Sequence, residues 1–335
     1  MSGSFTKPPS VVFRLGHMGD VALTTGVLAR WHATSGDTVV FITREGNAPL
    51  LENHPAVTEV VGLSTEELQS WFATAGNLAE RFRDHTLIDL HGILRSRILA
   101  LRWKGGVRRY PKFGLTRRLY DRTRLNAFRK KLEATTVPQR YAMALESVPP
   151  PAQAVVPRIF LTDAEQADAA ARLSPIHDHG PLVALHPYAT HPAKQWPREH
   201  WTSLIYRLEK EGMRWFVVGR DDTPLMAGDN RDLTNSTDLR QTCGLLKRAD
   251  LLVTGDSGPM HLACGVSTPV IALFGPTAKA WGFYPAGPDD TVLEHALDCR
   301  PCSLHGARPC RRGFECMASI TPDEVMETVR RRLAG

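Results

Sequence analysis

The stretch TGDSGPMHLACG (254–265) brings a carboxylate, a hydroxyl and an imidazole close together, as Asp256, Ser257 and His261. It follows the apolar run ADLLVTG, which is typical of a buried strand, so Gly258 and Pro259 are predicted to open the next helix. Backbone N–H groups at a helix start point outward without partners, and the helix dipole adds positive charge there. The stretch therefore predicts a site for an anion such as a diphosphate, and Gly258 leaves room for close approach.

The same stretch also fits a purely structural role, and the sequence leaves both roles open. Asp-Ser-Gly is a common turn, in which Ser257 acts only as a helix N-cap. His261 then serves as a hydrogen-bonded core histidine. A serine hydrolase is disfavoured, because G-D-S-G-P lacks the G-x-S-x-G order of a nucleophile elbow.

A second polar stretch, HPYATHPAKQWPREHW (186–201), directly follows another predicted strand. Lys194 would offer a point charge to a phosphate, and Thr190 a hydroxyl donor. His186 and His191 have no third ligand at helical spacing, which disfavours a metal site. Downstream, the strand RWFVVG is followed by two carboxylates that could bind a ribose, Asp221 and Asp222.

The N-terminal stretch VVFRLGHMGDVALTTGV is also a strand, a turn and a helix start. Gly16 and Gly19 leave a turn whose backbone can face a ligand, and Asp20 stands in the first turn of the helix. The spacing is not G-x-G-x-x-G, so a dinucleotide site is weakly supported. Asp20 has two open roles, a carboxylate favoured by the helix dipole or a general base.

The residues above are positioned by predicted strands and helices that alternate along the whole chain. Such alternation is typical of a parallel β-sheet whose strands are connected by helices. The proline-rich stretch 147–157 interrupts the alternation and is predicted to be a linker, giving domains 1–150 and 151–335. We expect two doubly wound α/β domains with a ligand site in the cleft between them, beyond the carboxyl ends of the strands. The predicted strands are 10–15, 38–43, 56–63, 85–90, 181–187, 214–219, 249–255 and 268–275, and the predicted helices are 19–33, 64–83, 93–103, 163–174, 198–211 and 238–248.

Positive charge is concentrated in one segment of the chain. Between Arg95 and Lys131 there are fourteen Arg or Lys residues and one acid, Asp121, a balance of +13 that leaves about −7 for the rest of a chain of net charge +6. Such a block can meet nucleic acid, anionic lipid or a phosphorylated acceptor, or can be a solvated helix face.

Composition predicts a globular cytoplasmic protein that could sit peripherally on a membrane. The first ten residues lack the apolar stretch of a secretory signal, and no apolar run has the length of a membrane span. Four of the six cysteines cluster near the end of the chain, with one C-x₂-C pair. In a reducing compartment they could hold a structural zinc ion or remain packed thiols, and both alternatives stay open: Cys299, Cys302, Cys310 and Cys316.

Five motifs occur in an order that resembles the lipopolysaccharide heptosyltransferases, glycosyltransferase family 9. They are LGHMGD near the start, DLHGILRS (89–96), HPAKQW followed by PREHW, DSGPMHLA (256–263) and FGPT (274–277). The resemblance implies a GT-B architecture of two Rossmann-like domains, with the acceptor on the N-terminal one and the nucleotide-sugar in the C-terminal one. It also implies inverting, metal-independent transfer with no cofactor. The cysteine-bearing tail is most similar to the heptosyltransferase II branch.

The resemblance implies a role for each candidate residue. An acceptor hydroxyl is a poor nucleophile, so Asp20 would take its proton, while Lys194 would stabilise the departing diphosphate. The donor would be an ADP-heptose, and the acceptor an anionic lipid-linked oligosaccharide at the inner face of the cytoplasmic membrane. Donor-binding residues would be Thr190, Asp221, Asp222, Asp256, Ser257, Gly258, Pro259 and His261, and acceptor-binding residues would be Gly19, Arg95, Arg117, Arg118 and Arg122.

Two other classes of protein remain as alternatives. A nucleotide-sugar epimerase of the same two-domain architecture would act on the donor alone. A nucleic-acid-binding protein would explain the basic block, but that block contains few aromatic residues on which bases could stack. Neither class explains the five ordered motifs as well as a transferase does, so we expect no nucleic-acid partner.

Overall fold

The structure is a computed structural model of the chain that describes residues 9–176 and 179–334. Internal contacts divide the chain into two compact units. Unit 1 runs to Lys112 and resumes over Pro138–Val155, and unit 2 consists of Phe113–Val137 and the chain from Val156 onward. The third change of unit, after Val155, therefore falls inside the proline-rich stretch 147–157.

Unit 1 is built on a five-stranded parallel sheet in the order β3-β2-β1-β4-β5. The four strands predicted in this half are confirmed, whereas β5 is too short to show a pattern in the sequence. All four residues of β1 are buried, as expected for a strand covered on both faces. The bounds are β1 Ser10–Phe13, β2 Val39–Arg44, β3 Val57–Leu63, β4 Thr86–Asp89 and β5 Val107–Arg109.

Helices of unit 1 start and stop where local chemistry requires. α1, Met18–Ser35, ends at Gly36, whose φ of 73° is a left-handed cap. The single helix predicted over 64–83 is wrong: the chain forms α2 (Thr65–Gln69) and α3 (Trp71–Arg81), separated at Ser70. A capping box between Ser64 and Glu67 starts α2. The remaining helical elements are η1 Glu45–Leu51, α4 Leu94–Arg102, α7 Val137–Ala142 and η2 Ala152–Val155.

Unit 2 has a second parallel sheet, in the order β10-β9-β8-β6-β7. All residues of β6 and β8 are buried, so the two central strands appear in the sequence as continuous apolar runs. The four strands predicted for this half are again confirmed, and the short edge strand β10 was not predicted. The bounds are β6 Leu182–His186, β7 Arg214–Val217, β8 Leu251–Gly255, β9 Val270–Leu273 and β10 Thr291–Leu293.

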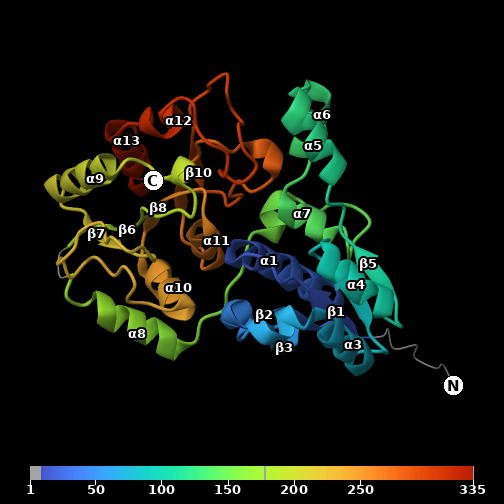
Figure 1. Cartoon of the computed structure of the whole chain (residues 1–335). Coiled ribbons are helices and arrows are strands. Elements are labelled where there is room, and N and C mark those ends of the chain that lie inside the picture. The colour runs from blue at the N-terminus through green and yellow to red at the C-terminus, as the bar shows by residue number, and fades with distance from the viewer. Residues whose placement is uncertain (1–8, 177–178, 335) are drawn as a thin grey trace. The chain divides into compact units, whose positions relative to one another are not determined.

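Helices cover both faces of this second sheet, with α9 and α13 packed together on one side and α8 and α10 together on the other (Figure 1). Capping boxes open α8 and α10, at Thr162 with Glu165 and at Asp238 with Gln241. The bounds are α8 Asp163–Leu173, η3 Pro192–Lys194, α9 Arg198–Lys210, α10 Leu239–Arg248, α11 Gly258–Gly265, η4 Lys279–Trp281, α12 Glu315–Ala318 and α13 Pro322–Leu333.

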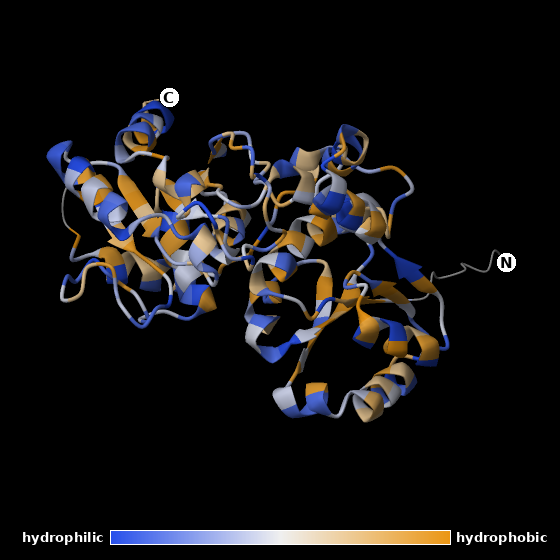
Figure 2. Ribbon diagram, turned by 45° about the horizontal axis from the view of Figure 1, so that its top comes forward, coloured by the Kyte–Doolittle hydropathy of each residue, from blue (hydrophilic) through white to orange (hydrophobic). Residues whose placement is uncertain are grey.

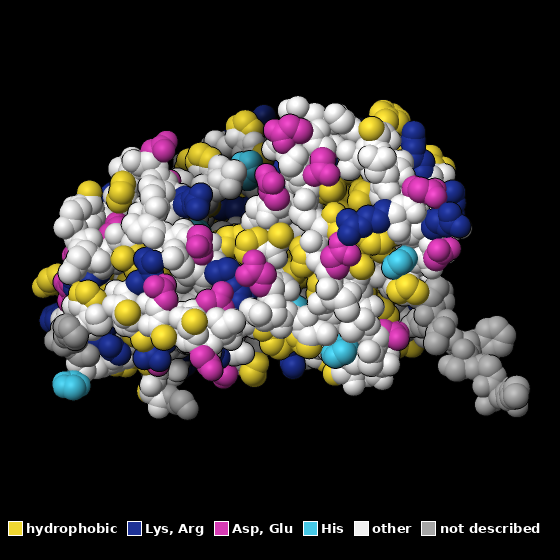
Figure 3. All heavy atoms as spheres, turned by 90° about the horizontal axis from the view of Figure 1, so that it is seen from below, with side chains coloured by type: hydrophobic (Ala, Val, Ile, Leu, Met, Phe, Trp, Pro, Cys, Tyr) yellow, Lys and Arg dark blue, Asp and Glu magenta, His cyan; other side chains and the backbone are white. Residues whose placement is uncertain are grey.

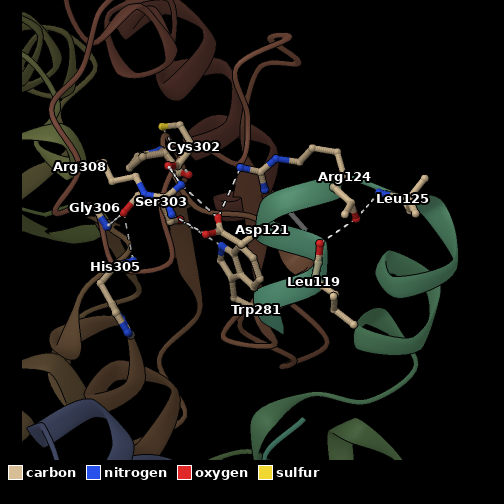
Figure 4. A network of polar contacts seen from close by, with 12 residues as sticks. Leu119, Asp121, Arg124, Leu125, Trp281, Cys302, Ser303, His305, Gly306 and Arg308 are labelled. Atoms are coloured by element: carbon tan, nitrogen blue, oxygen red, sulfur yellow. Dashed lines mark hydrogen bonds and ion pairs between the residues drawn. The ribbon is translucent and has the colours of Figure 1, made fainter. Parts of the chain in front are cut away.

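The segment 113–137 belongs to unit 2 by its contacts, although the division expected at residue 150 would place it in the N-terminal domain. It forms α5 (Gly114–Thr123) and α6 (Asn126–Glu133), neither of which was predicted. Tyr120 packs against the Trp281 ring, with centroids 5.6 Å apart. Arg308 joins Asp121 of α5 to the carbonyl of Cys302 (Figure 4). The basic block is thus split, with seven of its cations in each unit.

The strands of each unit form its apolar interior, and polar residues lie on the outer faces of the helices (Figure 2). The core of unit 1 gathers around Phe13, Trp71 and Leu87, and the core of unit 2 around Trp201, Trp215 and Val253. Within the described residues, helices that combine enough length with enough apolar character to cross a bilayer are absent.

Candidate functional site

The unit 2 sheet has a topological switch point between β6 and β8. From β6 the chain moves to β7 on one side and then returns to β8 on the other, and ligands of such sheets bind beyond the carboxyl ends of the strands at this place. The polar stretches that follow β6 and β8 meet here. Lys194 Nζ lies 2.7 Å from Asp256 Oδ2 and also donates to the Asp256 carbonyl at 3.2 Å.

This ion pair is largely withdrawn from water. The side chains of Lys194 and Asp256 are only 15% and 12% exposed, so both charges interact strongly with their surroundings. Thr277, from the FGPT motif after β9, donates to the same Asp256 oxygen at 2.8 Å. Asp256 therefore holds Lys194 in place, and the ammonium group sits where three strand ends converge.

Two glycines fix the path of the chain around Lys194. A Cβ on Gly255 would lie 3.0 Å from the Lys194 carbonyl oxygen. A Cβ on Gly306 would lie 3.0 Å from Lys194 Cγ, and the Gly306 φ of 86° is itself left-handed. The cysteine-bearing segment thus packs directly on the lysine side chain.

Ser257 occupies the N-cap position of α11, but its side chain does not cap the helix. The predicted N-cap position of Ser257 is thus confirmed, although its side chain makes no capping hydrogen bond. Its hydroxyl instead lies 3.1 Å from Thr254 Oγ1 and 3.2 Å from His186 Nδ1, forming a polar network across the ends of β6 and β8. Burial lowers the pKa of His186 to about 4, so this imidazole is neutral at physiological pH.

The start of α11 has the form expected of an anion site. Gly258 is its first residue and Pro259 stands in its first turn, where a missing N–H has no cost. Both are partly exposed, whereas His261 is buried within the helix at 6% exposure. Because α11 starts directly after β8, its first turn lies at the same edge of the sheet as the end of β6, which leads to Lys194.

The remaining donor candidates lie after the same strands, with weaker geometry. Thr190 is exposed in a bend after β6. Asp221 follows β7, and its side chain accepts from the Thr223 amide at 2.9 Å, which shapes its own loop. Asp222 is exposed beside it.

Unit 1 has its own switch point, between β1 and β4, and Asp20 lies there in the first turn of α1. Arg14, at the end of β1, places Nη2 2.5 Å from Asp20 Oδ2 and donates from Nη1 to the Leu90 carbonyl at 2.7 Å. Tyr141 of α7 donates to Asp20 Oδ1 at 3.4 Å. Burial raises the pKa of Tyr141, so its hydroxyl stays protonated and remains a donor.

The loop after β4 completes this edge of unit 1. Asp89 is fully buried and accepts from the amides of His91 and Gly92 at 2.9 and 2.8 Å. Lys112 donates to the carbonyls of the same two residues, both at 3.1 Å. Burial, together with the nearby Arg14 and Lys112 cations, lowers the pKa of His91 to about 3, so its ring is neutral near pH 7.

The acceptor candidates occupy three different elements. Gly19 is buried inside α1, next to Asp20. Arg95 of α4 donates to the Leu68 carbonyl at 3.1 Å, which ties α4 to α2. The other three lie on α5, with Arg117 partly exposed and Arg118 and Arg122 exposed.

The basic character of the surface is local. Around the α5 arginines stand two exposed leucines, Leu115 at 71% and Leu125 at 56%. On the face shown in Figure 3, acidic side chains lie among the basic ones. Cations framed by exposed leucines are suited to an anionic surface.

The four clustered cysteines are free thiols in the structure, with Cys316 buried and Cys299 exposed. Burial and the neighbouring cysteines raise the pKa of Cys316 to about 11 and also raise that of Cys302. Within residues 9–176 and 179–334, no three His, Cys, Asp or Glu side chains come together in a way that could hold a metal ion. The zinc arrangement considered from the spacing therefore has no formed ligand set here.

Sequence reasoning identified Lys194, Asp256 and Ser257, which the structure brings together. It missed His186 as the partner of Ser257, Arg14 as the partner of Asp20, and Thr277 as the partner of Asp256. The FGPT motif contained Thr277, so a signal was present there. A lone arginine at the end of a strand carries no such signal.

Comparison with known proteins gives a consistent family. A family model described as glycosyltransferase family 9 (heptosyltransferase) matches residues 77–308. Lipooligosaccharide heptosyltransferase 2 of Haemophilus ducreyi is 26% identical over 219 residues, which cover 58% of this chain and 62% of that protein. Lipopolysaccharide heptosyltransferase 1 of Escherichia coli is 23% identical over 290 residues, which cover 80% of this chain and 88% of that protein. The chain spans less than two thirds of the length of the heptosyltransferase 2 relatives it matches.

Solved structures share the fold along nearly the whole chain. E. coli ADP-heptose LPS heptosyltransferase II superimposes with a TM-score of 0.73 at 21% identity, covering 97% of this chain and 98% of that one. The family 9 glycosyltransferase of Veillonella parvula superimposes with a TM-score of 0.74 at 19% identity, covering 98% of this chain and 97% of that one. The expected GT-B architecture of two Rossmann-like domains is thereby confirmed.

Proposed function

Since the chain belongs to glycosyltransferase family 9, we propose that it transfers a heptose from an ADP-heptose to the inner core of lipopolysaccharide, with inversion at the anomeric carbon. The main support for this proposal is that Lys194, Asp256 and the start of α11 lie together at the switch point of unit 2. A cation and unpaired helix amides at one strand edge suit the diphosphate of a nucleotide-sugar.

In this proposal unit 2 holds the donor. Lys194 and the amides of Ser257 and Gly258 contact the diphosphate, with Pro259 shaping their turn and Thr190 adding a hydroxyl. When the anomeric carbon–oxygen bond breaks, its electron pair goes to the diphosphate, and these donors stabilise the growing negative charge. Asp256 orients Lys194 and faces the sugar hydroxyls. His261 supports the loop from within α11, and Asp221 and Asp222 take the ribose.

Unit 1 supplies the base. The Asp20 carboxylate takes the proton of the acceptor hydroxyl as its oxygen attacks the anomeric carbon. Gly19, directly before it, leaves room for the acceptor sugar, and Arg95 of α4 contributes to acceptor binding. The reaction needs no metal ion and no cofactor, because Lys194 and the helix amides provide the charge stabilisation that a divalent cation gives in other transferases.

The α5 arginines bind the anionic groups of the lipid-linked acceptor. Arg117, Arg118 and Arg122 lie on one short helix beside the exposed Leu115. This combination also supports a peripheral position on the inner face of the cytoplasmic membrane, because cations attract anionic headgroups while leucine enters the headgroup boundary.

The proposal is tested by ADP release measured with and without an acceptor of heptose-deficient lipopolysaccharide core. We expect release from ADP-heptose that depends on the acceptor, is unchanged by EDTA, and is far weaker with UDP- or GDP-sugars. The same donors should raise the melting temperature in the same order, because a ligand that binds only the folded state stabilises it. Acceptor-independent release, or equal protection by every nucleotide-sugar, would contradict the proposal.

A further inference from the structure

The Asp20 carboxylate is held by a buried cation at the end of β1. The Arg14 side chain has three anchors: Asp20 Oδ2 at 2.5 Å, the Leu90 carbonyl at 2.7 Å, and the Tyr141 ring, whose centroid lies 5.4 Å from the guanidinium carbon. Arg14 is 6% exposed, whereas the Asp20 side chain is 16% exposed. These contacts hold the guanidinium in place, and the carboxylate is the more exposed member of the pair.

The chain makes room for this arrangement at Gly16. A Cβ on Gly16 would lie 3.0 Å from Arg14 Nη2 and 3.1 Å from its Nε, so a larger residue would displace the guanidinium. The turn between β1 and α1 is thus shaped around Arg14. A strand-end arginine that is locked in this way behaves as part of the site.

We propose that Arg14 is a positioning residue for Asp20: it sets the orientation of the carboxylate and keeps it ionised to lower pH than an isolated carboxyl group. This inference deepens the proposed function and rests on it for the role of Asp20 as the base. Asp20 Oδ2 contacts Arg14 at 2.5 Å, and we assign proton uptake to the other oxygen, Oδ1, which Tyr141 contacts at 3.4 Å.

Arg14 contacts Asp20 directly and stays charged through the neutral range. Tyr141, from α7, is neutral because burial raises its pKa, and Tyr110 packs edge-on against its ring at 5.0 Å. His91, from the loop after β4, is neutral because burial, Arg14 and Lys112 lower its pKa to about 3. Lys112, which donates to the His91 carbonyl, and Arg44 are further cations that lower the pKa of His91.

The consequence is a charge effect that a purely structural role would not produce. An opposite charge within about 4 Å favours the ionised carboxylate and typically moves its titration down by about 1 to 3 pH units. Replacing Arg14 by a neutral residue should therefore move the acid limb of the pH profile to higher pH. A residue needed only for folding would lower activity equally at every pH.

The test is a titration of the Asp20 side chain by carbon NMR in protein labelled at aspartate, with the resonance assigned by its absence in Asp20→Asn. In the parent protein we expect Asp20 to stay ionised between about pH 8 and pH 5. In Arg14→Gln the titration should move up by about one pH unit or more. Arg14→Lys keeps the charge and should shift less, and Tyr141→Phe, which removes a contact but no charge, should shift it by a few tenths at most.

The acid limb of kcat/KM for sugar transfer should follow the NMR titration in each variant. Asp20 titrating at the same pH in Arg14→Gln as in the parent would overturn the inference. If Arg14→Gln fails to fold by circular dichroism, a parent Asp20 that titrates above about pH 5 overturns it equally well. The NMR titration needs no turnover, so absence of transfer in the parent would count against the proposed function and leave the coupling of Arg14 to Asp20 to be decided separately.

Discussion

At the residue scale, the proposed transfer depends first on Asp20 acting as the general base. Asp20→Asn keeps the size of the side chain and removes its basicity. We expect normal folding, donor affinity within a few fold of the parent, and turnover reduced by roughly a hundredfold or more, the scale of losing a general base. Transfer at near the parent rate in this variant would leave Asp20 with only its structural contacts to Arg14 and Tyr141.

Lys194 is the residue on which donor binding depends most. Lys194→Ala should weaken donor binding and lower turnover still more, because the diphosphate carries more charge as it leaves than in the ground state. The change also leaves the mostly buried Asp256 carboxylate without its lysine partner, so its negative charge repels the donor. Kinetics with a series of donor concentrations separate the two effects on kcat and KM.

A second variant distinguishes loss of the contact between Lys194 and the diphosphate from repulsion of the donor by Asp256. Lys194→Ala combined with Asp256→Asn removes both charges, so repulsion by Asp256 is gone. If Lys194 contacts the diphosphate, the double variant stays impaired in turnover. Recovery of the parent kinetics would mean that Lys194 serves only to neutralise Asp256. Lys210→Ala, an exposed lysine at the end of α9, is the matched control and should change nothing.

At the scale of elements, α5 connects the basic block to a function. Charge reversal of Arg117, Arg118 and Arg122 to Glu should weaken use of the anionic acceptor at least tenfold and leave donor affinity unchanged, because these cations steer and bind the acceptor. Added salt should weaken acceptor use by the parent more than by the variant, since salt screens exposed charges. In sedimentation with anionic vesicles, the variant should likewise bind the vesicles more weakly than the parent.

The matched control for α5 carries the same change in net charge elsewhere in unit 2. It reverses three exposed cations on α9, α10 and α13, namely Lys210, Arg248 and Arg331. This control should retain acceptor use. If acceptor use falls as much in this control as in the α5 variant, the loss is caused by the change in net charge and not by the position of the cations on α5. If the α5 variant loses donor affinity instead, the proposed role of α5 is wrong.

The longer strands and the motif-bearing turns were predictable from sequence, whereas the short edge strands β5 and β10 and the helices between 113 and 142 were not. Buried parallel strands such as β6 and β8 are continuous apolar runs, and the turns after them hold the polar residues of the site. α5 is rich in arginine, and its packing depends on Tyr120 meeting Trp281, a contact across more than 160 positions of the chain. Such long-range contacts have no local pattern. For the same reason Arg14 beside Asp20 could not be foreseen.

At the scale of the whole molecule, buried neutral histidines make stability depend on pH. Burial lowers the pKa of His186 to about 4 and, with nearby cations, that of His91 to about 3, whereas in the unfolded chain each is protonated near pH 6.5. Between these values the unfolded chain binds more protons, so stability rises with pH and is lost as pH falls from about 7 toward 4.

Thermal unfolding at about pH 7.5 and about pH 5 measures this loss. The parent should melt at a lower temperature at the lower pH. His186→Asn keeps a polar atom near Thr254 and Ser257 but does not titrate, so its two melting temperatures should differ less than those of the parent. An equal difference in both proteins would show that His186 does not contribute to the pH dependence.

Inverting transfer of a heptose can be followed by NMR of the reaction product. The chain is incubated with ADP-heptose and heptose-deficient core acceptor in the presence of EDTA, and the anomeric proton and carbon of the product are examined. The account predicts one new heptosyl linkage whose anomeric configuration is opposite to that of the donor, with one ADP released per linkage. Free heptose, an epimerised donor without transfer, or a linkage that retains the donor configuration would contradict it.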